Sequence, residues 1–168
     1  MKVEDLCAGD ELIYCGELII MRDAAQKRLC EALDKGNVLP VSLKDKVIFY
    51  AGSAKPTEGS FGDIGPTTSA RMDPFLEMLY RLGVKATIGK GKRGRLAVDL
   101  CREYRRAYLL APSGAAAALA ERVVSLEPIA YEDLGTEAIF LAEVKEFPLY
   151  VAIDVSGSNV FDLHIDRG

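Results

Sequence analysis

Residues 84–111 read VKATIGKGKRGRLAVDLCREYRRAYLLA, and this stretch decides the fold class. Residues 84–88 are a short apolar run typical of a buried strand, and residues 89–94 are a loop rich in glycine. Residues 95–104 repeat apolar side chains at helical spacing, and residues 107–111 are a second strand-like run. Strand, loop, helix and strand in this order are typical of α/β proteins.

The same alternation continues toward the N-terminus. Residues 46–51 (KVIFYA) predict a strand, and the glycine-rich residues 52–65 predict a loop. A helix is expected from Pro66 through Leu82, because proline suits the first turn of a helix and apolar side chains then recur on one side.

Two further elements precede this unit. Residues 22–35 predict a helix with Asp23 in its first turn and Gly36 after its last. Residues 10–20 are expected to be extended, as one strand or as two short strands divided at Gly16.

The C-terminal third shows a different pattern of elements. Residues 113–122 predict a helix of small residues. Strands are expected at 123–130, 137–144 and 148–155, with a tight turn at 156–159. An alternating middle joined to a strand-rich start and finish predicts an α/β fold with a mixed sheet.

Size and composition set the class of protein. A chain of 168 residues fits one domain, so we expect residues 1–168 to share one core. Hydrophobic residues make up 49% and charged residues 27%, as in soluble globular proteins. The formal net charge of −4 argues against nucleic acid as a partner.

No apolar run approaches the roughly 20 residues of a membrane span, and the acidic residues 1–5 do not resemble a signal peptide. We therefore expect a cytoplasmic protein.

The four cysteines are Cys7, Cys15, Cys30 and Cys101, and the only histidine is His164. No C-x-x-C pair occurs, so a zinc site or a complete iron–sulfur site built from this chain alone is not expected. Cys30 and Cys101 lie in apolar periodic stretches, which predicts that they pack as small hydrophobic side chains.

Three short segments lie where a strand gives way to a helix or loop, which is where ligands bind in open α/β sheets. The first is Arg22-Asp23 at the start of the predicted helix. The planar guanidinium of Arg22 matches a carboxylate, and a helix N-terminus adds free N–H groups. The alternative is a solvated arginine with no ligand.

The second segment is GPTTSARMD, residues 65–73. At the expected helix N-terminus, Thr67, Thr68 and Ser69 would offer hydroxyl and N–H groups around one point, which suits an anion. Arg71 lies one turn further on, and helical side chains lean toward the N-terminus, so its guanidinium can reach the same anion. The alternative is an N-cap followed by an exposed arginine.

The third segment is GKGKRG, residues 89–94, which matches the G-x-G-x-x-G pattern of dinucleotide-binding loops. That reading also requires an acidic residue at the end of the next strand, where this chain has 111–113 (APS). A Walker A loop requires Ser or Thr where Gly91 stands. The loop is therefore a nucleotide site, a flexible basic loop, or a loop that presents Lys90 to an anion. Together the three segments suit a small dicarboxylate.

These residues resemble the C-terminal domain of class I fumarases and the beta subunit of L-tartrate dehydratase. GPTTSARMD resembles the most characteristic stretch of that family, and Gly89-Lys90-Gly91 resembles its lysine loop. Residues 22–29 resemble its first helix, and residues 135–139 (GTEAI) with 147–148 (FP) resemble its closing strands. The resemblance runs in order from about Gly9 to Phe161. This chain departs from the family at Gln26, where a histidine is usual, at Met21, and at Gly52-Ser53, where Gly-Pro is usual.

The resemblance implies a swivelling β/β/α fold and a hydro-lyase that hydrates and dehydrates a small dicarboxylate, fumarate/malate first and tartrate next. It also implies a partner alpha subunit that holds a 4Fe-4S cluster by three cysteines. The open iron of that cluster would act as a Lewis acid on the substrate. The chain described here would bind no metal or cofactor alone and would be inactive without its partner.

The resemblance further implies roles for individual residues. The substrate carboxylates would be bound by Arg22, Arg71 and Lys90. Thr67 would be the catalytic base at C3, unless it only caps a helix and a carboxylate of the partner is the base. Backbone N–H groups would line the site at Thr68, Ser69 and Ala70. The rival functions are a nucleotide-binding domain that uses residues 89–94, and a non-catalytic regulatory or assembly domain.

Overall fold

A mixed sheet, bent into a closed ring, organises the protein. The computed structural model describes residues 1–53, 64–112 and 119–165. The strands are β1 (Glu11–Ile20), β2 (Val47–Phe49), β3 (Ala51–Ser53), β4 (Ile64–Pro66), β5 (Ala86–Gly89), β6 (Ala107–Leu110), β7 (Val123–Ala130) and β8 (Ile139–Ile153). The α-helices are α1 (Asp23–Asp34), α2 (Asp73–Arg81), α3 (Arg95–Tyr104) and α5 (Val160–Ile165), and the 3-10 helices are η1 (Val3–Asp5), η2 (Ala70–Met72) and η3 (Glu132–Glu137).

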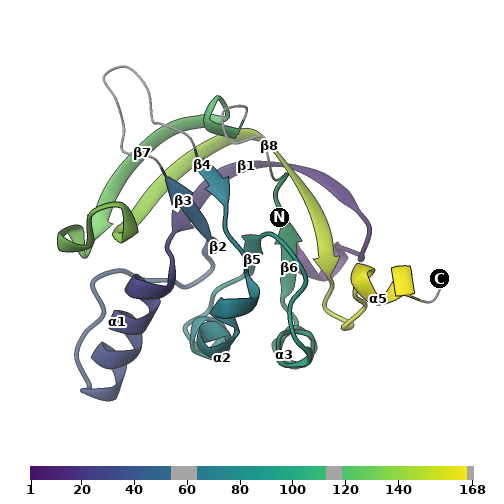
Figure 1. Ribbon diagram of the computed structural model, residues 1–168, viewed down its shortest axis with the longest axis horizontal. Coiled ribbons are helices and arrows are strands. Elements are labelled where there is room, and N and C mark those ends of the chain that lie inside the picture. The colour runs from purple at the N-terminus through teal and green to yellow at the C-terminus, as the bar shows by residue number, and fades with distance from the viewer. Residues whose placement is uncertain (54–63, 113–118, 166–168) are drawn as a thin grey trace.

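The strand order of the main sheet is β1-β2-β5-β6-β8-β7, and β1 also pairs with β8. The first four strands run parallel to their neighbours, whereas β8 is antiparallel to β1, β6 and β7. Because β8 pairs with both β6 and β1, the sheet closes on itself. Helices α1, α2 and α3 lie along one side of it (Figure 1). The predicted α/β fold with a mixed sheet flanked by helices is confirmed.

Alternating side chains of the strands fill two separate cores. Along β2, Val47 and Phe49 belong to the core inside the ring, whereas Ile48 packs in the core under the helices. On β6, Leu109 likewise faces the ring and Tyr108 faces the helices. Strands buried on both faces read as continuous apolar runs, which is why the sequence predicts them well.

For residues 10–20, the single extended strand is confirmed: β1 runs from Glu11 to Ile20, and Gly16, at φ +146°, marks a pairing irregularity rather than a break. One strand prediction needs correction. The strands expected at 137–144 and 148–155 are one strand, β8, which begins at Ile139. Glu146 absorbs the bend between its halves by adopting a left-handed conformation, with φ +54°.

The predicted strand at 46–51 divides after Phe49, because Ala51–Ser53 leaves the main sheet to pair with Ile64–Pro66 in a hairpin. The helix expected at 113–122 lies mostly outside the described residues. Helix α5 at Val160–Ile165 was not predicted.

The helix expected from Pro66 through Leu82 is wrong at its start. Pro66 ends β4, and α2 begins only at Asp73, after the single turn of η2. The backbone of Thr67 is already engaged, since its N–H donates to the carbonyl of Tyr50 at 2.8 Å. The proline in the first turn of the helix is Pro74.

The carboxylate of Asp154 stabilises the turn that follows β8. It accepts the N–H groups of Ser156 and Ser158, and the N–H of Ala8 from the N-terminal segment at 2.9 Å. Burial opposes its ionisation, but the hydrogen bonds from the Ser156 hydroxyl and the backbone hold the pKa of Asp154 below its usual value.

We expect Asp154→Asn to lower the free energy of unfolding at pH 7 by about 1.5–3 kcal/mol, the usual range for hydrogen bonds to a charged group. A lowered folded-state pKa contributes stability above the unfolded pKa of about 3.9 and loses it as the pH falls through the folded value. The difference between variant and wild type should therefore shrink below about pH 4. Thermal melts at pH 2–8 measure this, with the exposed Asp34→Asn as control. Parallel curves for Asp154→Asn and wild type would contradict it.

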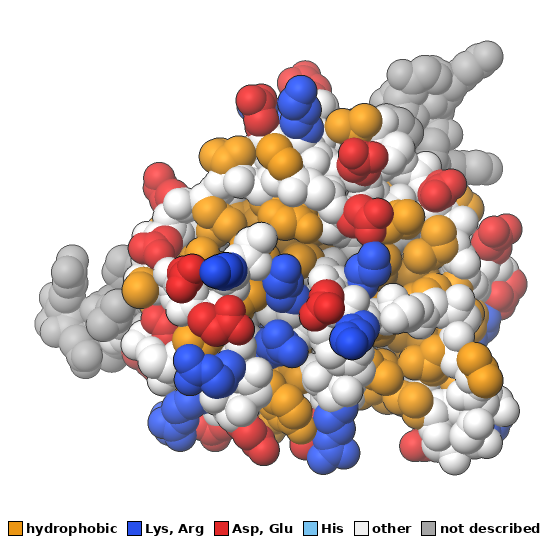
Figure 2. Space-filling view, turned by 180° about the vertical axis from the view of Figure 1, so that it is seen from behind, with side chains coloured by type: hydrophobic (Ala, Val, Ile, Leu, Met, Phe, Trp, Pro, Cys, Tyr) orange, Lys and Arg blue, Asp and Glu red, His pale blue; other side chains and the backbone are white. Residues whose placement is uncertain are grey.

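No helix in the described part of the chain is both long enough and apolar enough to cross a membrane. Figure 2 shows basic and acidic side chains intermingled over one face of the molecule. A nucleic-acid-binding face is usually dominated by Lys and Arg, and this face is not.

Candidate active site

Arg22 lies at the junction of β1 and α1. Its backbone is extended, and α1 begins at the next residue. The Nε atom of Arg22 is buried, has no hydrogen-bond partner among the described residues, and lies 3.8 Å from a carboxylate oxygen of Glu137. Gly52 lies beside the same guanidinium, since a Cβ there would be 3.5 Å from Nη1 of Arg22.

Helix η3 brings Glu137 to this place. Arg28 of α1 forms an ion pair of 2.8 Å with Asp133 of η3 and stacks over the ring of Tyr131, 5.0 Å from its centroid. These contacts join α1 to η3. The arginine at the start of the helix therefore meets an acidic residue more than a hundred positions away.

Arg71 is the second arginine of the site. Its Nε donates to Asp23 at 2.8 Å, and its Nη2 donates to the hydroxyl of Thr67 at 3.0 Å. Burial opposes ionisation of Asp23, but the hydrogen bond from Arg71 and the charge of Arg22 lower the pKa of this carboxyl. The carboxylate is therefore charged at neutral pH and neutralises Arg71 in the free protein.

Arg22 and Arg71 line one hollow of about 490 Å³. Its lining also contains Asp23, Ala24, Lys27, Phe75 and Glu137. Three cations thus face two carboxylates across a small open space. A bound dianion with two carboxylates would take the places at the arginines that Asp23 and Glu137 approach now.

The segment that follows β4 forms backbone hydrogen bonds with residues just beyond the ends of β2 and β5. The N–H of Lys90 donates to the carbonyl of Thr67 at 3.3 Å, and the N–H of Ser69 donates to the carbonyl of Lys90 at 3.1 Å. The lysine loop and the threonine segment, predicted from separate motifs, are therefore neighbours. The side chain of Lys90 is exposed, and Lys90 is not in the lining of the hollow.

The three hydroxyl residues do not surround one point as expected. Thr67 is half-buried and Thr68 is exposed, as is Ala70. Ser69 is fully buried, and its hydroxyl oxygen lies 2.9 Å from the hydroxyl of Tyr108. Both the N–H and the hydroxyl of Ser69 are thus engaged inside the protein. No side chain caps α2 or η2, so the interpretation of these residues as N-caps is also wrong.

One basic residue of the loop at 89–94 is held inside the protein. Arg93 is only 2% exposed, and its Nε donates to Asp73 at 2.6 Å. Burial opposes its charge, but Tyr50 and Asp73 keep the pKa of Arg93 above its ordinary value.

The nucleotide interpretation fails at the same place. The N–H of Gly94, at the start of α3, already donates to the carboxylate of Asp73 at 3.0 Å. A phosphate in a glycine-rich loop needs such N–H groups free and a positive potential, and here a carboxylate occupies the position.

The cysteines lie apart from one another. Cys7 and Cys15 are exposed, Cys30 packs against Met78, and Cys101 is buried beside Tyr80. Burial raises the pKa of Cys101 to about 11, so its thiol is protonated and unreactive. Cys30 and Cys101 pack as hydrophobic side chains, as predicted. Among the described residues, no three side chains of the metal-binding types gather.

Two of the departures from the family pattern lie beneath the site. Gln26 is fully buried, with its amide nitrogen 3.3 Å from the sulfur of Met72. Met21 is 1% exposed and belongs to the core under the helices. Neither lines the hollow.

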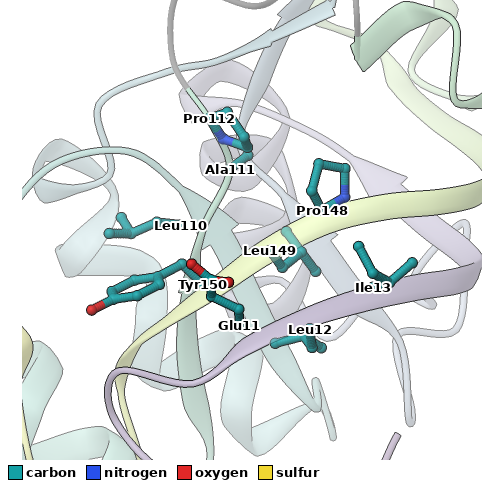
Figure 3. A pocket seen from close by; sticks show the side chains of 9 residues that line it. All are labelled: Glu11, Leu12, Ile13, Leu110, Ala111, Pro112, Pro148, Leu149 and Tyr150. Carbon is teal, nitrogen blue, oxygen red and sulfur yellow. The ribbon is translucent and has the colours of Figure 1, made fainter.

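A larger hollow, of about 630 Å³, lies elsewhere, between β1, β8 and the end of β6 (Figure 3). Its lining is mostly apolar and includes Leu12, Leu149 and Pro112, and Glu11 is the only charged residue among the described residues that line it. A carboxylate without a cation does not suit an anion, so this hollow is not the candidate site.

Several residues of the site were not singled out from the sequence. They are Lys27, Asp73, Phe75, Arg93, Tyr108 and Glu137. Because Arg93 is charged and lies in a glycine-rich loop, the sequence gives no sign that its side chain is buried. Glu137 lies in the GTEAI stretch, but only the tertiary structure shows that it faces Arg22.

Fold and site together define an α/β domain with a hollow at the strand ends that two arginines and two carboxylates line. The family model described as the fumarase C-terminus matches residues 1–164, and the chain belongs to that family.

Individual relatives agree. The chain is 40% identical over 149 residues to the class I aerobic fumarate hydratase of Escherichia coli K12, covering 87% of this chain and 27% of that protein. It is 36% identical over 154 residues to mitochondrial fumarate hydratase 1 of Leishmania major, covering 90% and 28%. It is 34% identical over 164 residues to the L(+)-tartrate dehydratase beta subunit of E. coli K12, covering 94% and 80%. The chain thus spans just over a quarter of the fumarate hydratases and most of the tartrate dehydratase subunit.

Proposed function

We propose that this chain is the beta-type subunit of a two-subunit iron–sulfur hydro-lyase that reversibly hydrates a small dicarboxylate. Fumarate/malate is the first choice of substrate and tartrate the next. The observation that carries the proposal is the hollow in which Arg22 and Arg71 lie together, with Thr67 hydrogen-bonded to Arg71. Membership of the fumarase C-terminus family and the names of the relatives support it.

The charges of the hollow suit a dicarboxylate. Each arginine offers a planar fork of donors that matches one carboxylate, and Arg22 keeps an unpaired buried Nε for this purpose. On substrate binding, Asp23 would leave Arg71 and Glu137 would move from Arg22. Lys90 would reach the substrate from the adjoining loop.

Thr67 would be the base that removes or returns the C3 proton. Backbone N–H groups of Thr68 and Ala70 would line the site. Ser69 is removed from that group, because its N–H donates to Lys90.

The 4Fe-4S cluster would belong to a partner alpha subunit, since the cysteines of this chain lie apart. The cluster would supply a Lewis-acidic iron for the substrate. The assembled enzyme would be cytoplasmic.

The test is anaerobic reconstitution with the alpha subunit, iron and sulfide, followed by assays with fumarate, malate, L-tartrate and mesaconate. The chain alone is expected to be inactive, and activity should appear on mixing. Activity from the isolated chain in the presence of a chelator would overturn the proposal. So would an inactive complex that holds an intact cluster. Tight binding of NAD(P)H in a fluorescence titration would favour the nucleotide alternative.

Arg71→Lys should lower kcat/KM of the reconstituted enzyme by about one to two decades. Lysine keeps the charge but loses the two-pronged geometry, and a charge-assisted hydrogen bond contributes roughly 1.5–3 kcal/mol. Arg22→Lys should behave similarly. Arg81→Lys, at the far end of α2 and outside the hollow, is the matched control. Equal kinetics for Arg71→Lys and Arg81→Lys would remove the substrate from this hollow.

A further inference from the structure

Two loops from different parts of the chain must keep a fixed relative position in the proposed site. One carries Thr67 and leads into η2, and the other carries Lys90 at the end of β5. Two backbone hydrogen bonds join them, of 3.3 Å and 3.1 Å. The isolated bridge between Thr68 and Lys90 is the only strand-type pairing of these loops in the described residues. Such a short pairing beyond the end of β5 is weak by itself, so a further contact is needed to hold it.

Tyr108 of β6 supplies that contact. Its side chain passes beneath both loops, and its hydroxyl lies 2.9 Å from the Ser69 hydroxyl oxygen and 2.8 Å from the Gly91 carbonyl oxygen. Tyr108 is fully buried, and burial raises the pKa of its phenol to about 12. The phenol is therefore protonated at neutral pH. Its single O–H donates to the Gly91 carbonyl, which can only accept, and its oxygen accepts the hydroxyl of Ser69.

The surroundings of Tyr108 are shaped for this contact. A side chain at Gly89 would collide with the Ser69 hydroxyl, so only glycine at the end of β5 lets Ser69 reach Tyr108. On the other side, the guanidinium of Arg93 stacks on the ring of Tyr108 at 5.0 Å and on that of Tyr50 at 5.2 Å.

We propose that Tyr108 is a positioning residue of the hydro-lyase, whose phenol holds the lysine loop against the Thr67–Ser69 segment. It touches no substrate and acts through Ser69 and Gly91. A misplacement of about 1 Å in a catalytic geometry can cost 10²-fold in rate. By fixing the relative position of Lys90 and Thr67, the phenol would control whether both residues can contact the same substrate molecule. The catalytic part of this proposal rests on the proposed function.

The first experiment is Tyr108→Phe in the reconstituted enzyme, with Tyr80→Phe as the matched control. Tyr80 is also a buried tyrosine of the core under the helices, but its hydroxyl contacts only Cys101, at 3.4 Å, among the described residues. Tyr108→Phe is expected to lower kcat/KM five- to fiftyfold, with a rise in KM and a fall in kcat. Tyr80→Phe is expected to stay within twofold of wild type. Equal kinetics for the two variants would overturn the catalytic role.

The second experiment needs no activity. Amide hydrogen exchange of the full chain should show the N–H groups of Ser69 and Lys90 exchanging at least tenfold faster in Tyr108→Phe, relative to the amides of α1. Tyr80→Phe should leave this ratio unchanged. Unchanged protection in Tyr108→Phe, or equal loss in both variants, would overturn the proposal. An inactive wild-type complex would overturn the proposed function and the catalytic role with it, while exchange still decides whether the phenol holds the loops.

Discussion

Thr67→Ala is expected to lower turnover of the reconstituted enzyme by roughly 10²–10⁴, the usual contribution of a general base. It should also abolish exchange of the C3 proton of malate or tartrate with deuterated water. Folding should be almost unaffected, because the backbone hydrogen bonds of Thr67 to Tyr50 and Lys90 remain.

The physical basis lies in Arg71. A threonine hydroxyl is a poor base, because its alkoxide is too high in energy near neutral pH. A helix N-terminus at Thr67 could stabilise this alkoxide, but α2 begins only at Asp73, too far along the chain. The structure offers a stronger donor instead, since Nη2 of Arg71 lies 3.0 Å from the Thr67 hydroxyl oxygen. A preorganised donor at a developing negative charge is the usual means of such stabilisation.

The competing explanation is that Thr67 only anchors Arg71 and that a carboxylate of the partner is the base. Thr67→Ala would then lose about tenfold, as a misplaced arginine does, and the C3 proton would still exchange. Thr67→Ser is the control, because serine keeps the hydroxyl near Arg71 and should retain most of the activity. Persistent exchange in Thr67→Ala would show that Thr67 is not the base.

Arg93→Met should lower the free energy of unfolding by about 3–5 kcal/mol, the usual loss when one partner of a buried ion pair is removed. Asp73, whose side chain is only 14% exposed, would lose its ion-pair partner. The guanidinium contacts to Thr87 and Tyr50 would be lost as well.

Urea unfolding of the purified chain measures this effect, and Arg95→Met provides the control. Arg95 pairs with Asp99 on the exposed face of α3 with a side chain that is 77% exposed, so its loss should cost less than about 1 kcal/mol. The double variant Arg93→Met/Asp73→Asn should recover part of the loss, because asparagine still accepts the N–H of Gly94 without a buried charge. A loss below about 1 kcal/mol for Arg93→Met would show that the pair is not structural.

The sequence predicts this fold where local patterns dominate. Buried strands such as 84–88 and amphipathic helices such as 95–104 were placed to within a few residues, because their periodicity reports burial directly. The start of α2 was misplaced because two prolines, Pro66 and Pro74, both suit a first turn. The hydrogen bond from Thr67 to Tyr50 keeps the chain extended after Pro66, so the helix begins near Pro74. No sequence pattern reveals that hydrogen bond.

The candidate site shows the same division. Arg22, Arg71 and Lys90 could be proposed from strand ends and motifs, and the structure brings them to neighbouring places. The burial of Ser69 was not predicted, because it depends on the close approach that Gly89 allows. The approach of Glu137 to Arg22 depends on the packing of η3 against α1, which no local pattern encodes.

The closed ring has a consequence for how the chain folds. Strand β1 obtains most of its hydrogen bonds from β8, with Glu11 opposite Tyr150 and Ile20 opposite Phe140. Strand β1 therefore waits for β8, the last of the described strands, and contacts of such long sequence separation slow folding to roughly milliseconds to seconds. Until β8 arrives, β1 has an open edge, and unpaired edges promote aggregation. We therefore expect the helices and parallel strands of the middle to form before β1 and β8 pair and close the ring.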